Sequence, residues 1–178
     1  MKKIIFVMCI FIIVSFMTNI KKVSSQDVTI PKEAIRLRIL ANSNNEIDQN
    51  IKMKLSIELQ KEITVLLKDT SNVEEARLKL KNNMDILNKK TKEILKQENY
   101  NKEFTITFGN VFFPEKKYND VIYEKGYYES LLVTLGNGKG NNWWCVLFPP
   151  LCLMEANETE TGKVEYKFFV QELIDKYF

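Results

Sequence analysis

The sequence contains no histidine. Nucleophile systems of the serine–histidine and cysteine–histidine kinds need an imidazole base, so neither can be built from this chain. A catalytic zinc site normally uses histidine as well, and the two cysteines outside the leading segment do not complete a structural zinc site. The sequence therefore predicts no catalytic residue, no metal and no cofactor, and it favours a protein that acts by binding a partner.

An excess of charge of one sign is also lacking beyond the first 25 residues. The whole chain has a net charge of +3, but Lys2, Lys3, Lys21 and Lys22 all lie in a leading segment without acidic residues. From Gln26 onward, 22 basic residues are matched by 23 acidic ones. A nearly neutral domain lacks the field that gathers nucleic acid, so no nucleic-acid partner is expected.

Long apolar runs are confined to the N-terminus. Met1-Lys2-Lys3 precedes an apolar core of 14 residues, Ile4–Met17, and the small residues of Val23-Ser24-Ser25 follow. This order predicts a signal peptide over residues 1–25 and an exported domain over residues 26–178. A spanning helix needs about 20 apolar residues, so the core is short for a permanent anchor. Two lysines close to the cleavage point leave open an uncleaved, membrane-tethered form, and membrane contact is otherwise expected only through a partner.

Cysteine is scarce, and export would leave only Cys145 and Cys152. An oxidising compartment permits a disulfide between them, because the intervening Pro149 and Pro150 force a turn. Two buried thiols packed as small apolar groups are the alternative. The sequence gives no distance between the two Cα atoms, so both interpretations stay open.

Two patterns of apolar residues predict the first half of the exported domain. Residues 34–40 alternate between apolar and basic side chains, which is typical of a half-buried strand. Ser43 with Glu46, and Ser71 with Glu74, have the spacing of capping boxes at helix starts. Apolar residues at spacings of three and four follow each box, so we expect two helices that form an antiparallel hairpin.

The second half changes to the alternation of strands. Residues 103–108 predict one strand, and residues 127–135 and 143–148 predict two more, joined in a hairpin by the glycine-rich run 136–140. Residues 164–178 predict a closing helix. The order favours a single α+β domain, with a mainly antiparallel sheet and with the helical hairpin and the C-terminal helix packed on one face.

The most unusual segment contains both tryptophans of the chain. Trp143 and Trp144 are adjacent, so on a strand they point to opposite faces and at most one can enter a given core. The other is either covered by helices or exposed as an interface aromatic. Packing is the simpler interpretation, and a partner-binding surface is the functional one. That surface would consist of Trp143, Trp144, Phe148, Pro149, Pro150 and Leu151.

Two further motifs are weaker candidates for a catalytic or ligand-binding site. Glu124 and Glu129 flank Gly126 and form the one carboxylate pair worth testing for glycoside hydrolysis, which would make the chain an exported cell-wall hydrolase. The run 136–140 contains a lysine among glycines, as phosphate loops do, but it leads into a predicted strand and no Ser or Thr follows the lysine. The hairpin interpretation is therefore the stronger one.

The sequence resembles stage II sporulation protein R, a family of spore-forming Gram-positive bacteria. The resemblance rests on residues spread from Ala34 to Cys152, and its longest part is rich in tryptophan, cysteine and proline. The matching stretches are Ile35–Ser43, Asp48-Gln49, Lys52 with Lys54, Phe113-Pro114 with Tyr118, Gly126–Leu131 and Gly138–Cys152.

This resemblance implies a function that composition and spacing do not reveal. Members of the family are secreted from the forespore into the space between forespore and mother cell. There they activate a membrane-embedded aspartic protease of the mother cell that processes pro-sigma-E. The resemblance supplies no catalytic or binding residues. A structural protein of the septum remains the alternative to a signal or a hydrolase.

Overall fold

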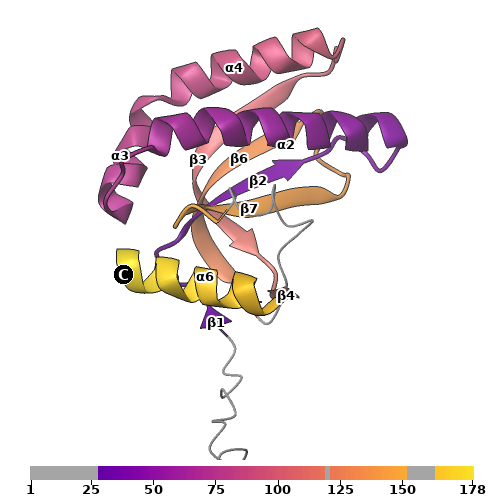
Figure 1. Ribbon diagram of the computed structural model, residues 1–178. Coiled ribbons are helices and arrows are strands. Elements are labelled where there is room, and N and C mark those ends of the chain that lie inside the picture. The colour runs from indigo at the N-terminus through magenta and orange to yellow at the C-terminus, as the bar shows by residue number, and fades with distance from the viewer. Residues whose placement is uncertain (1–27, 119–120, 152–162) are drawn as a thin grey trace, which may run out of the picture.

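The computed structural model describes residues 28–118, 121–151 and 163–178. These residues form a single α+β domain, as predicted (Figure 1). The predicted signal peptide and Cys152 lie outside the described residues. Among the residues that are described, no helix has the length and apolar character needed to cross a membrane.

A four-stranded sheet lies at the centre of the domain. Its strands are β2 (Ile35–Leu40), β3 (Phe104–Phe113), β6 (Gly126–Leu135) and β7 (Asn142–Phe148), in the spatial order β3-β6-β2-β7. β2 is parallel to β6 and antiparallel to β7, and β3 is antiparallel to β6. A smaller sheet joins β1 (Val28–Thr29), β5 (Val121–Tyr123) and β4 (Lys116–Tyr118), with β1 parallel to β5. The sheets are therefore mixed.

The predicted hairpin between β6 and β7 is wrong. Both strands exist, but β2 lies between them and pairs with each. The connection at residues 136–141 crosses the end of β2, and the Lys139 and Gly140 amides donate to the Asn42 and Ala41 carbonyls at 3.2 and 2.8 Å. The sequence prediction failed because positive φ angles, here +52° at Gly136 and +62° at Gly138, occur in crossing loops as well as in hairpins.

Three helices cover one face of the central sheet (Figure 1): α2 (Glu46–Leu67), α3 (Val73–Asn82) and α4 (Met84–Gln97). The second predicted helix is thus two, because the chain breaks at Asn83. Both predicted capping boxes are one or two residues off. Asn45 and Asn72 are the N-caps, and their side chains accept from the Asp48 and Glu75 amides.

Two apolar clusters hold the layers together. The first fills the space between the sheet and α2–α4 and includes Leu37, Ile39 and Leu147. The second lies on the other face of the sheet, where β1, β5 and Val146 meet α6 (Lys163–Tyr177). Strand alternation explains the division, because neighbouring residues such as Val146 and Leu147 point to opposite faces. The C-terminal helix was predicted on the same face as the helical hairpin, but its described residues Val170, Leu173 and Ile174 pack in the second cluster, on the opposite face. Tyr177, at its end, packs against the first cluster.

Candidate functional site

The two tryptophans lie on opposite faces of β7, as predicted. Trp143 is half-buried against the first cluster and Trp144 is half-buried against the second. Trp144 makes edge contacts with Phe113 and Tyr123, with ring centroids 5.4 and 5.3 Å apart. Packing on the sheet face away from α2–α4 therefore explains why Trp144 does not need a partner protein to cover it.

The guanidinium of Arg36 lies at the centre of this packing. Its Cζ is 3.4 Å from the ring centroid of Tyr128, 4.9 Å from that of Phe113 and 5.5 Å from that of Trp144. The ring centroid of Tyr123 is 5.9 Å from the same Cζ atom. We call these four rings and Arg36 the aromatic box. A guanidinium against aromatic faces gains cation–π attraction, which is larger when the pair is removed from water.

Arg36 is completely buried, and its three side-chain nitrogens meet no hydrogen-bond partner in the part of the chain that the structure describes. Burial lowers the pKa of Arg36, while the Tyr128 and Tyr123 side chains oppose that shift. No described acidic group forms an ion pair with Arg36, and the surrounding rings offset part of the cost of removing its charge from water. The neighbouring Arg38 is better satisfied, because its Nη1 donates to the Phe112 carbonyl at 2.7 Å.

The rest of the predicted partner-binding segment is largely internal. Phe148 and Leu151 are 2% and 1% exposed, Pro149 is buried and Pro150 is half-buried. Only the two tryptophans and Pro150 therefore contribute appreciable surface, and their role in binding stays a prediction. Cys145 is buried in the first cluster and is disulfide-bonded, whereas Cys152 lies outside the described residues, so the pairing of Cys145 with Cys152 stays a prediction.

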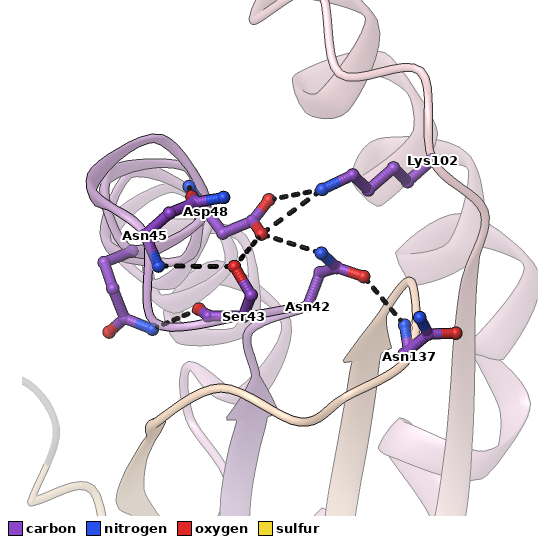
Figure 2. A network of polar contacts seen from close by, with 7 residues as sticks. Asn42, Ser43, Asn45, Asp48, Lys102 and Asn137 are labelled. Carbon is purple, nitrogen blue, oxygen red and sulfur yellow. Dashed lines mark hydrogen bonds and ion pairs between the residues drawn. The ribbon is translucent and has the colours of Figure 1, made fainter.

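A polar network joins the start of α2 to the loops around it (Figure 2). Its centre is Asp48, which is 1% exposed. Asp48 Oδ2 accepts from Asn42 Nδ2 at 2.7 Å and from Ser43 Oγ at 2.6 Å, and Lys102 Nζ lies 2.9 Å from Oδ1. Asn42 Oδ1 in turn accepts from the Asn137 amide at 3.0 Å. We call this arrangement the Asp48 network.

The electrostatics of the network follow from these contacts. Burial alone would raise the pKa of Asp48, but the hydrogen bonds from Asn42, Ser43 and Lys102 outweigh it and lower the pKa to about 2. Burial, together with the negative charge of Asp48, raises the pKa of Tyr100 to about 12. Asp48 is therefore fixed as a carboxylate at neutral pH, with its oxygens already engaged, which suits a structural role and not a proton donor.

The glycine-rich loop is attached to the same network. A Cβ on Gly136 would overlap Asn42 Oδ1, and one on Gly140 would overlap the Ser43 carbonyl oxygen. Lys52, which is 6% exposed, links α2 to the loop by donating to Gln49 Oε1 at 2.6 Å and to the Asn141 carbonyl at 3.3 Å. The network thus ties together stretches about 90 residues apart, and its members Asn42, Ser43 and Asp48 lie in stretches that carry the family resemblance.

A groove of about 520 Å³ opens at the far end of α2. Its apolar wall consists of Ile63, Leu67, Leu147, Phe148, Pro150 and Tyr177, and its polar rim includes Lys68, Asp69 and Lys176. Phe148 and Tyr177 form an edge contact with ring centroids 4.8 Å apart at its base. The groove is therefore built partly from the segment that the sequence analysis assigned to partner binding.

The carboxylate pair of the hydrolase alternative is not arranged as a pair by any described contact. Glu129 Oε2 accepts from Arg77 Nε at 2.6 Å, and Lys81 Nζ lies 3.8 Å from Glu129 Oε1. Glu124 is exposed before β6, and its backbone carbonyl accepts from the Tyr128 hydroxyl at 2.9 Å. Within the described residues, no three acidic or cysteine side chains gather as a metal site would require.

Sequence reasoning missed the aromatic box, the Asp48 network and the groove. The alternation of Arg36 with apolar residues predicted a strand with solvated arginines, because period-2 patterning does not distinguish solvent from a second buried layer. The available signal was the set of aromatic residues at Phe113, Tyr128 and Trp144. Nothing in sequence order shows that these three meet around one arginine.

Comparison with known proteins gives a consistent result. The model of the family described as stage II sporulation protein R matches residues 31–158. A curated relative, stage II sporulation protein R of Bacillus subtilis (strain 168), is 39% identical over 143 residues. The match covers 80% of this chain and 64% of the relative, so it spans slightly less than two thirds of that protein. No solved structure matches the chain significantly.

Proposed function

Because the chain belongs to the stage II sporulation protein R family, we propose that it is an exported signal that activates a membrane-embedded aspartic protease during sporulation. Family membership, and with it a role in sporulation, is the observation that carries the proposal. In this proposal the forespore secretes the chain into the space between the two cells. The protease of the mother cell then processes pro-sigma-E.

Features of the chain itself support a binding role for it. The sequence has no histidine, and two of the less exposed carboxylates, those of Asp48 and Glu129, are engaged by Lys102 and by Arg77. The leading segment has the order of a signal peptide, which would deliver the chain across the membrane. A protein without an evident catalytic group then acts through where it is delivered and what it contacts.

Reconstitution tests the proposal. The full-length chain is coexpressed with the protease and the sigma precursor in a host that does not sporulate, and precursor cleavage is followed by immunoblot. We expect cleavage only when all three proteins are present. A matched chain that lacks residues 1–25 should remain in the cytoplasm and fail to support cleavage. Cleavage at equal rates without the chain would refute the proposal.

The hydrolase alternative has its own test. Purified chain is incubated with peptidoglycan, and soluble fragments are measured beside the Glu124→Gln and Glu129→Gln variants. The signalling proposal expects no fragments from any of the three proteins. Fragment release by the unmodified chain, abolished in either variant, would favour the hydrolase. A passive septum protein would fail the reconstitution, because it would not support precursor cleavage.

A further inference from the structure

The groove between α2 and α6 combines an apolar wall with a cationic rim. The wall residues Leu67 and Tyr177 pack against the first cluster and are only half-buried, and they border an open volume of about 520 Å³. A volume of this size is typical of sites that hold a small ligand or a few side chains of a partner. Its apolar wall favours hydrophobic side chains as the occupant.

The charges at the rim further restrict the kind of partner segment that can bind in the groove. Lys68 and Lys176 are both exposed, and within the described residues neither forms an ion pair. Asp69 is the one acidic residue among those that line the groove. A third ammonium group, that of Lys79, lies next to the groove and donates to the Lys68 carbonyl at 3.2 Å, but it is paired with Glu75 Oε1 at 3.1 Å and adds no net charge. The rim thus carries a local positive excess on an otherwise nearly neutral domain.

We propose that this groove docks an apolar segment of the partner protein that carries acidic residues. Hydrophobic side chains of the segment lie against Leu67, Pro150 and Tyr177, and its carboxylates face Lys68 and Lys176. Charge complementarity of this kind directs the encounter and fixes the orientation of the docked segment. The inference rests on the proposed function, because it assigns to the activated protease the segment that enters the groove.

Charge inversion at the rim tests the chemistry of docking. In the reconstituted system, we expect the double variant K68E/K176E to reduce the rate of precursor cleavage by roughly tenfold, because two attractions become repulsions. The matched control is K89E/K92E, which inverts two exposed lysines of α4 and should leave the rate unchanged. Thermal unfolding of the three proteins should give the same midpoint, since all four lysines are exposed.

Site-specific photocrosslinking tests the location. A benzoylphenylalanine replaces Thr64, a half-buried residue that lines the groove, and in a separate chain it replaces Lys89 on α4. We expect illumination to give an adduct with the protease from position 64 and none from position 89. Mass spectrometry of the adduct should identify a segment of the protease with apolar and acidic residues.

The outcomes separate this inference from the proposed function. If the unmodified chain supports cleavage but K68E/K176E does so equally well, the groove is not the docking site and the signalling role stands. Adducts from position 64 that involve only the chain itself or a second copy would overturn the inference in the same way. Failure of the unmodified chain to support cleavage would overturn both.

Discussion

Arg36 and Tyr128 lie on neighbouring strands with the guanidinium carbon 3.4 Å from the ring centroid, both fully or nearly fully buried. Among the described residues no carboxylate pairs with this guanidinium, and aromatic faces offset part of the cost of burying its charge. The contact joins β2 to β6, the parallel pair at the centre of the sheet.

We expect Arg36→Met to change the free energy of unfolding by less than about 1 kcal/mol. Methionine has a similar length and fills the box, and the lost cation–π attraction is offset by the removal of a desolvated charge. Arg36→Ala, which leaves a cavity between the rings, should cost about 3 kcal/mol. Urea unfolding measures both values. A loss from Arg36→Met as large as that from Arg36→Ala would mean that the guanidinium itself stabilises the fold.

The stability of the chain should fall in acid through Asp48. The pKa of Asp48 is lowered to about 2 in the folded state, against an ordinary value of 3.8. A lowered folded-state pKa contributes stability that is complete above the ordinary value and is lost as pH falls towards 2, and here it amounts to about 2 kcal/mol. Unfolding free energies between pH 6 and pH 2 should show this loss.

The variant Asp48→Asn should be less stable at pH 7 and should lack that part of the acid dependence. Glu93→Gln, which alters an exposed carboxylate of α4 without an ion pair among the described residues, is the matched control and should follow the unmodified chain. If Asp48→Asn and the unmodified chain lose stability in parallel below pH 5, the Asp48 network does not hold the carboxylate as described.

Gly140→Ala should destabilise the domain by about 2 kcal/mol. The new Cβ would overlap the backbone carbonyl of Ser43, which cannot move without disturbing the start of α2, and forced overpacking costs about 1–3 kcal/mol. Gly109→Ala is the control, because a Cβ there meets no atom within 4 Å. That variant should be neutral or slightly stabilising through the unfolded state. Equal thermal midpoints for both variants would show that the loop is not pinned to β2.

The tryptophan variants need a stability measurement beside the activity measurement. We expect Trp143→Ala and Trp144→Ala to lose precursor cleavage, as the sequence analysis predicts, and also to lose about 2 kcal/mol because both rings are half-buried. Trp144→Phe keeps an aromatic face toward Arg36 and should recover most of that stability. If both alanine variants remain folded and support normal cleavage, neither tryptophan contributes to the partner-binding surface.

The locations of most strands and helices could be predicted from the sequence, and their partners could not. Period-2 alternation placed β2 and β3, and spacings of three and four placed α2, because such patterns are local. The insertion of β2 between β6 and β7 is not local. The alternative topology, in which β6 and β7 pair directly as a hairpin, would use the same glycines and the same strands. Only packing against α2–α4 on one face and the second cluster on the other distinguishes the two.

The sequence by itself determined the class of the domain, the absence of histidine chemistry, the opposite orientations of Trp143 and Trp144, and the family. Each of these depends on residue identity or on spacing within one segment. The tertiary structure alone decided that Arg36 is buried among aromatic rings, and that Asn42 links Asp48 to the loop before β7. It also decided that Phe148 and Pro150 border a groove with Lys68 and Lys176. These contacts join residues up to about 110 positions apart, and proximity over such distances is created by burial of the shared core.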